Sequence, residues 1–172
     1  MRETMQNATV QTVLIRASLL LAACAPAGCE MEGFNYDGNR AAPGMISSNK
    51  EWKITAQGGQ FQNLRSAIDN NQLTAAVSGR NYTNAFVTVD LGQLCFFNCI
   101  SILHGENQDG YARQVAASIS SDGQTFRHIK TVYGTRKVTY ILLDQPVRAR
   151  FLRLTAVRQN VHPWSISEII LQ

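Results

Sequence analysis

The chain has 172 residues and a formal net charge of +4, from 16 basic and 12 acidic residues. This length accommodates one domain plus a tail, and the aliphatic and aromatic content excludes a wholly disordered chain. The basic residues are scattered, with tight clusters only at Arg136-Lys137 and among Arg148, Arg150 and Arg153. A nucleic-acid-binding surface usually shows a denser stripe of positive charge. We therefore interpret the charge as a solvated surface and expect no nucleic-acid partner.

Residues 1–23 are predicted to be a signal segment. A polar stretch with basic residues precedes the apolar run Ala17–Ala23, which is too short to span a bilayer. The sequence Leu21-Ala-Ala-Cys24 resembles the bacterial lipobox, in which the cysteine is lipidated and becomes the new N-terminus. We expect lipidation at Cys24 and an extracytoplasmic, lipid-anchored protein of the bacterial cell envelope. The alternative is a cleaved secretion signal and a secreted product.

The cysteines of the second half, Cys95 and Cys99, are four residues apart, a spacing that matches no common zinc signature. Along a straight strand they would lie roughly 13 Å apart, beyond disulfide reach. They could pair only if the chain turned between them. The other interpretation makes Cys99 a small core residue at the start of a strand.

Residues 24–50 are rich in Ala, Gly, Pro, Asn and Ser, which is typical of a tether. The tether leads to a predicted domain at 51–172. The alternating segment Trp52–Thr55 is the candidate first strand, and a helical turn is predicted around Leu64–Ile68.

The second half of the chain has the period of two that is typical of strands. Val87, Val89 and Leu91 would share one face of a strand, with polar residues between them on the other. An Asp-Gly pair at Asp122-Gly123 supplies the positive φ of a tight hairpin. Further strands are predicted at 99–103, 114–119, 125–129, 138–143, 150–155 and 166–171. Short strands at this spacing predict an all-β, two-sheet antiparallel sandwich.

Four motifs carry a resemblance to a known family: Val89–Gly92, Ser120–Phe126, Ala149–Leu154 and Ser167–Ile169. In this order they resemble the discoidin domain, also called the coagulation factor V/VIII type C domain. The resemblance covers about residues 52–172 and implies a galactose-binding-like jelly-roll β-sandwich. Bacterial members similar to this chain are commonly sugar-binding modules. Animal members bind phospholipid head groups or protein partners.

The resemblance also implies a structural Ca²⁺ site. The ligand positions that match in spacing are Asp69, Asn71, Thr74 and Glu168. Carboxylate, hydroxyl and carbonyl oxygens are the ligands that Ca²⁺ prefers. The sequence departs from the family pattern, because Asn70-Asn71 replaces the usual Gly-Asp and alanines stand at 75 and 76. The alternative is that Asp69 is a loop or helix-cap residue and Glu168 is solvated.

A ligand is expected at the loops of one end of the sandwich, because rigid sheets hold them in place. The loop at 104–113 combines aromatic, amide, imidazole and guanidinium groups, which can stack on a sugar ring and bind its hydroxyls. A late loop adds a tryptophan. The predicted contacts are His104, Asn107, Tyr111, Arg113 and Trp164. Alternatively, Arg113 pairs with a surface carboxylate, Tyr111 fills the mouth of the sandwich and Trp164 plugs the core.

No His-Glu-x-x-His, Gly-x-Ser-x-Gly or phosphate-binding glycine-rich motif occurs in a suitable context. The sequence therefore predicts a non-catalytic carbohydrate-binding module on the cell envelope, touching the membrane only through its lipid. The runner-up is an adhesion or assembly module that binds a protein or phospholipid head group. The third interpretation is an enzyme of unrecognised chemistry.

Overall fold

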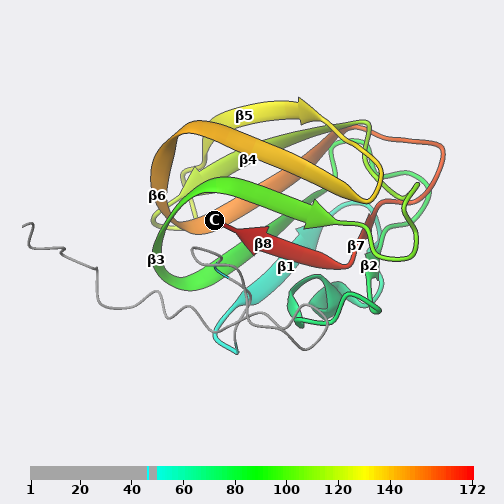
Figure 1. The fold of residues 1–172 in the computed structure, drawn as a ribbon, viewed down its shortest axis with the longest axis horizontal. Helices are drawn as coiled ribbons and strands as arrows, with labels where there is room; N and C mark the ends of the chain where they lie inside the picture. The colour runs from blue at the N-terminus through cyan, green and yellow to red at the C-terminus, as the bar shows by residue number, and fades with distance from the viewer. Residues whose placement is uncertain (1–45, 47–49) are drawn as a thin grey trace, which may run out of the picture.

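The structure is a computed structural model that describes Ile46 and residues 50–172. The predicted signal segment, Cys24 and nearly all of the predicted tether lie outside these residues. The elements are β1 (Lys53–Gln57), the 3₁₀ helix η1 (Leu64–Ile68), β2 (Ala76–Val77), β3 (Phe86–Leu103), β4 (Gln114–Ser120), β5 (Arg127–Tyr133), β6 (Val138–Arg158), β7 (Ser165–Ile166) and β8 (Glu168–Leu171) (Figure 1). Within the described part of the chain, no helix is long and apolar enough to cross a membrane.

All strand pairs are antiparallel. The main sheet has the order β1-β3-β6-β4-β5, with β8 also pairing with β3, and β2 pairs with β7 in a small second sheet. The helical turn predicted around Leu64–Ile68 is η1. The prediction of an all-β antiparallel sandwich is confirmed.

β3 and β6 are each one long strand, where the sequence predicted two shorter ones. The first part of β3 pairs with β1 and its last part pairs with β8. Between these parts the register with β6 shifts, from Asp90 to Cys95 and again from Phe97 to Cys99, and Gly92 has a φ of 77°. Such bulges bend and twist a strand without ending its pairing. The two strands therefore curve together and carry the sheet into both layers of the sandwich (Figure 1).

The core lies between the two layers. Val87, Val89 and Leu91 are fully buried, as their predicted alternation required, and Leu152 and Leu154 of β6 lie beside the first two in the sheet register. The second layer contributes the following buried residues: Ile100, Ile102, Ile141, Ile169 and Leu171. Full burial of such a side chain contributes about 1.5–3 kcal/mol. The alternating pattern thus provides the main stabilisation of the sandwich.

The two cysteines in β3 do not pair with each other. Cys95 is disulfide-bonded, whereas Cys99 is a free, buried thiol whose Sγ lies 3.8 Å from the Ser101 Oγ. The prediction of Cys99 as a small core residue is confirmed.

Candidate functional site

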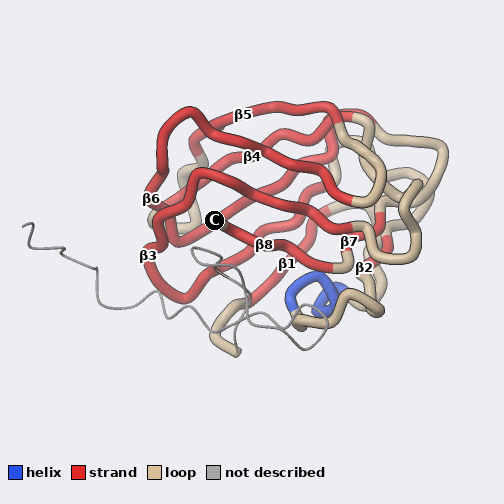
Figure 2. Tube along the Cα trace, viewed as in Figure 1, coloured by secondary structure: helices blue, strands red, loops and turns tan. Residues whose placement is uncertain are grey.

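Most of the loops gather at the end of the sandwich opposite the bends of β3 and β6 (Figure 2). Polar contacts join these loops to one another. The Arg136 Nε lies 2.9 Å from the Asp109 Oδ1, and the Asn160 Nδ2 donates to the Asp109 carbonyl at 3.2 Å. The Ser165 N–H donates to the Gly110 carbonyl at 2.7 Å. The loop at 104–113 is therefore fixed by the two loops that flank it.

Tyr82 stands at the centre of this loop cluster. Its hydroxyl accepts from the Asn160 N–H at 2.7 Å and donates to the His162 carbonyl at 3.1 Å. Burial raises the pKa of Tyr82, with the Asn160 hydrogen bond and the Arg113 charge opposing that rise. The phenol therefore remains a donor at neutral pH. The Tyr82 side chain is fully buried.

An open pocket of about 260 Å³ lies at this end, lined by Tyr111, Arg113, Tyr133, Gly134 and Arg158. Its residues come from the loop immediately before β4, from the end of β5 and the residue that follows it, and from the end of β6. Because β4 pairs with both β5 and β6, these three strand ends are adjacent. Tyr133 is 76% exposed, and both arginines are exposed. The pocket thus presents two aromatic rings and two guanidinium groups to solvent.

Gly134 brings two of the lining segments together. Its N–H donates to the Arg113 carbonyl at 3.0 Å. A Cβ at this position would collide with the Ala112 carbonyl oxygen and lie 3.0 Å from the Tyr111 ring. The close approach of β5 to the loop before β4 therefore requires glycine here.

His104 lies behind the pocket and not in it, contrary to its predicted role as a ligand contact. Its side chain is fully buried, with the Nδ1 2.7 Å from the Ser165 carbonyl and the Nε2 3.0 Å from the Thr139 Oγ1. A carbonyl only accepts, so Nδ1 carries the proton and Nε2 accepts from Thr139. Burial lowers the pKa of His104, opposed by the Ser165 hydrogen bond. The neutral ring lies 6.2 Å from that of Tyr111 and supports it from the interior.

Trp164 is likewise a core residue, which corrects its prediction as a stacking surface. It is fully buried, with its ring 5.9 Å from that of Phe61 and 6.2 Å from that of Tyr82. Asn107 is exposed on the same loop as Tyr111 but does not line the pocket. Of the five predicted contacts, Tyr111 and Arg113 therefore share the open pocket.

Sequence reasoning missed Tyr133, Gly134 and Arg158. Each lies where a strand ends or immediately after it, which is a weak signal by itself. The signal becomes useful only when the order of β5, β4 and β6 in the sheet is known.

Three of the four predicted metal ligands lie together in the loop after η1. The Asp69 Oδ2 lies 2.7 Å from the Thr74 Oγ1, and its Oδ1 accepts from the Asn71 N–H at 3.0 Å. Glu168 is fully buried at the start of β8, so the alternative of a solvated glutamate is wrong.

The loop after η1 and the residue just before β8 both lie beside Gly105. A Cβ at Gly105 would lie 3.0 Å from the Gln72 carbonyl oxygen and 2.9 Å from the Ser167 Cβ, so both segments border the same glycine. In the described residues, no group of three or more His, Cys, Asp and Glu side chains is placed to hold a metal ion. The predicted ligands offer carboxylate, hydroxyl and carbonyl oxygens, which are the atoms that a hard cation such as Ca²⁺ prefers.

Comparison with known proteins places this geometry in a family. No curated protein matches the sequence. The solved structures that resemble it include two from Clostridium perfringens, the module CpGH89CBM32-5 in complex with GalNAc-β-1,3-galactose and the family 32 carbohydrate-binding module of NanJ in complex with galactose. The first is 19% identical with a TM-score of 0.61, over 71% of this chain and 96% of that one. The second is 20% identical with a TM-score of 0.60, over 70% and 93%.

A third similar structure is the chitosan-binding module 1 of a chitosanase/glucanase from Paenibacillus sp. IK-5. It is 17% identical with a TM-score of 0.60, over 70% of this chain and 93% of that one. At these identities the likeness shows the fold. The F5/8 type C domain model matches residues 46–169, which is most of the chain. The protein therefore belongs to the F5/8 type C domain family, the one that its sequence motifs resemble.

Proposed function

We propose that this domain is a non-catalytic carbohydrate-binding module and that the pocket of Tyr111, Arg113, Tyr133 and Arg158 is its sugar site. The observation that carries the proposal is the grouping of two tyrosines and two arginines in one open pocket. The solved modules of the same fold that bind galactose, GalNAc-β-1,3-galactose or chitosan support it.

The side chains suit a sugar for separate reasons. A tyrosine ring offers a flat apolar face to the C–H face of a sugar, and its hydroxyl can pair at the edge. A guanidinium offers several donors in a fixed fork, which suits neighbouring hydroxyls. Among the described residues, neither Arg113 nor Arg158 has a carboxylate within 4.0 Å. Their donors therefore remain available to a ligand.

A glycan array followed by calorimetry tests this proposal. We expect a few preferred neutral glycans, with affinity reduced roughly tenfold by Tyr133→Ala, since such aromatic contacts dominate small binding sites. Tyr140→Ala is the matched control, because Tyr140 is 56% exposed on β6 and lies outside the pocket. Arg113→Ala should also weaken glycan binding. Its control is Arg80→Ala, at an exposed arginine outside the pocket, which should leave binding unchanged. Preferred glycans that bind equally well to all four variants would contradict the proposed site.

An anionic phospholipid head group is the second candidate for the same end of the molecule. It is favoured by the unpaired charges of the two arginines and by two exposed apolar side chains in the loops, Leu73 at 81% and Val161 at 79%. Sedimentation with phosphatidylserine and phosphatidylcholine vesicles separates the candidates. Binding to the anionic vesicles that Leu73→Ser and Val161→Ser abolish, together with an empty glycan array, would favour the lipid.

Ca²⁺ held by Asp69, Thr74, Glu168 and backbone carbonyls of the 69–74 loop forms a further part of the proposal. The ion would cross-link the loop after η1 to β8 and so stabilise the folded state by mass action. We expect added Ca²⁺ to raise the Tm of the protein and Asp69→Asn to remove the increase. Glu106→Gln, at an exposed acidic residue in another loop, is the control. An unchanged Tm in Ca²⁺ and in EDTA would exclude the site.

Lipid anchoring at Cys24 to the bacterial cell envelope completes the proposal. The sequence Leu21-Ala-Ala-Cys24 after a short apolar run supports this part of the proposal. Labelled palmitate should enter the wild-type protein and the Cys29→Ala variant but not Cys24→Ala. Incorporation that survives Cys24→Ala would remove lipid anchoring from the proposal.

A further inference from the structure

A second and larger hollow lies on the outer face of the layer formed by β1, the start of β3 and the end of β6. Its volume is about 430 Å³, within the range of small-molecule sites. It borders Gly123, in the hairpin after β4, whereas the sugar pocket borders Tyr111 and Arg113, before β4. The two hollows share no lining residue and lie at opposite ends of that strand. The lining residues used below are Lys53, Thr55, Gln57, Phe86, Phe151 and Arg153.

The Arg153 guanidinium is held in place in this hollow by three contacts. Its central carbon lies 3.6 Å from the ring centroid of Phe126 and 4.3 Å from that of Phe86. Its Nε donates to the Thr88 Oγ1 at 3.2 Å. Within the described residues, its two terminal nitrogens have no hydrogen-bond or carboxylate partner. The group is thus fixed in position with its outer donors available.

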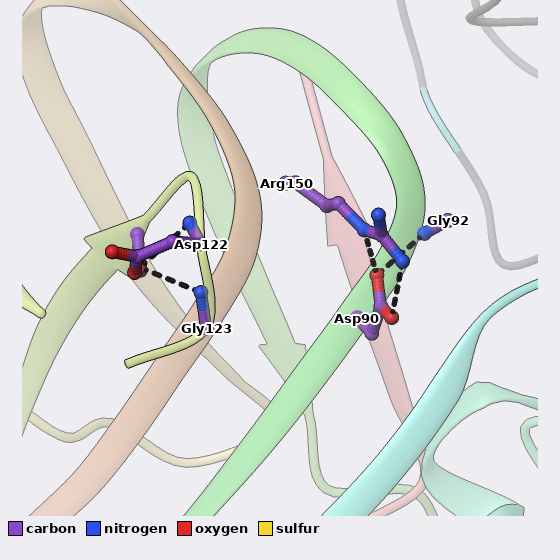
Figure 3. A network of polar contacts seen from close by, with 6 residues as sticks. Asp90, Gly92, Asp122, Gly123 and Arg150 are labelled. Carbon is purple, nitrogen blue, oxygen red and sulfur yellow. Dashed lines mark hydrogen bonds and ion pairs between the residues drawn. The ribbon is translucent and has the colours of Figure 1, made fainter. Parts of the chain in front are cut away.

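Asp90, the one carboxylate among the described residues that line the hollow, already has partners. The Asp90 oxygens accept from the Arg150 Nε at 2.8 Å and from its Nη2 at 3.0 Å, and the Gly92 N–H donates to Oδ1 at 2.9 Å (Figure 3). These Arg150 hydrogen bonds are the main cause that lowers the pKa of Asp90. Asp90 is therefore anionic and paired, and no other carboxylate in the described part of the chain forms an ion pair with Arg153.

The neighbouring hairpin adds no counterion either. The Asp122 Oδ1 accepts from the Ser120 Oγ at 2.7 Å and from the N–H groups of Gln124 and Thr125 at 2.8 and 2.9 Å, so it is used within its own turn. Lys53, opposite Asp90 in the sheet register, is exposed and adds a second positive charge. The excess of charge in the hollow is therefore positive.

We propose that this hollow is a second binding site, and that its ligand is a sugar unit bearing a carboxylate. The planar fork of Arg153 matches a carboxylate in two parallel hydrogen bonds. Thr55 and Gln57 offer partners to hydroxyls, and Phe86 and Phe151 offer apolar contact to the ring. Partial burial removes water from the Arg153 guanidinium and so lowers its pKa. A bound anion would compensate for this lost solvation. The proposal is independent of the sugar site at the other end.

The test is an NMR titration of the ¹⁵N-labelled protein at low ionic strength, because salt screens such a contact. Glucuronic acid is the probe, glucose is its neutral match, and sodium acetate supplies the carboxylate without the sugar. We expect glucuronic acid to shift the amide resonances of residues 53–57, 86–90 and 151–153, with much weaker effects from glucose and acetate.

Three variants test which side chains contribute to the affinity for glucuronic acid. Arg153→Gln should weaken glucuronic acid at least roughly tenfold, since a charged hydrogen-bonded pair is lost. Lys53→Gln replaces an exposed side chain without disturbing the core and should weaken it several-fold. Arg80→Gln replaces an exposed arginine that lines neither pocket and should leave the titration unchanged.

Several results would overturn the proposal. They are shifts confined to Tyr111, Arg113 and Tyr133, equal responses to glucose or acetate, and full affinity in folded Arg153→Gln and Lys53→Gln proteins.

Discussion

His104 links one buried side chain to the pH dependence of the whole domain. Its pKa in the folded state is lowered by burial, so the unfolded chain binds the proton more tightly. The stabilisation that the neutral, buried His104 contributes is therefore fully present above the ordinary histidine pKa of 6.5. It decreases as the pH falls below that value. We expect the free energy of unfolding to fall by up to about 1.4 kcal/mol per pH unit in that range.

Urea unfolding at pH 8 to 5 measures this contribution against that of His104→Asn, which cannot titrate. The variant should be roughly 1–3 kcal/mol less stable at pH 8, because the buried hydrogen bonds of the imidazole to the Ser165 carbonyl and the Thr139 hydroxyl are disrupted. Its stability should then change less than that of the wild type as the pH falls. His128→Asn, at an exposed position on β5, is the control and should follow the wild-type curve. Parallel curves for all three proteins would contradict the role of His104.

Asp122 gives a second prediction at the scale of one residue. Hydrogen bonds from Ser120, Gln124 and Thr125 lower its pKa to about 2, with the Ser120 hydroxyl as the largest cause. NMR titration of the carboxyl should find that value in the wild-type protein. Ser120→Ala should raise the pKa toward the ordinary 3.8, whereas Ser121→Ala should leave it in place. The stabilisation from this turn is present above that ordinary pKa and is lost as the pH falls toward 2.

Individual side chains in the loops were the least predictable part of the chain. In strands, alternation reveals which side chains point inward, and Val87, Val89 and Leu91 are buried as predicted. A loop has no such period, so composition could place His104 and Trp164 near a ligand but could not tell that both point into the core.

Among the elements, the ends of β4, β5 and β6 create the sugar pocket, and Gly134 holds them together. Gly134→Ala should separate the loop before β4 from the end of β5, because the added methyl would meet the Ala112 carbonyl. We expect a loss of roughly 1–3 kcal/mol in unfolding free energy, the usual cost of overpacking, and weaker glycan binding. Denaturant unfolding and calorimetry measure the two effects. Gly79→Ala, whose methyl would lie at least 3.4 Å from its neighbours, is the control and should change neither.

The continuity of β3 and β6 could not be predicted from local pattern. The alternating pattern of Val87–Leu91 is interrupted before it begins again at Cys99–Leu103. Such an interruption predicts two separate strands. The structure instead maintains pairing with β6 through shifted registers near Gly92. A bulge and a strand end have similar sequence signals, and only the partner strand distinguishes them.

At the scale of the molecule, the fold was the most predictable feature. Period-two segments and turn residues fixed an antiparallel sandwich, because every layer must bury one face of each strand. The sites depend on which strands are neighbours, and no local pattern gives that order. Thus Tyr111 and Arg113 were found from their loop, but Tyr133 and Arg158 join them only through the pairing of β4 with β5 and β6.

Two hollows at opposite ends of β4 predict that their ligands bind independently. Tyr133 lies at the end of β5 and Arg153 lies opposite Ser118 on β4, with no shared partner among the described residues. Sites without shared contacts should have additive effects, within about 0.5 kcal/mol. Calorimetry on Tyr133→Ala, Arg153→Gln and the double variant measures this. Tyr133→Ala should weaken only the neutral glycan and Arg153→Gln only glucuronic acid, and the double variant should lose both. If saturation with one ligand changed the affinity for the other, the prediction of independent binding would be wrong. The two sites would then be coupled through the strands that join the two ends of the sandwich.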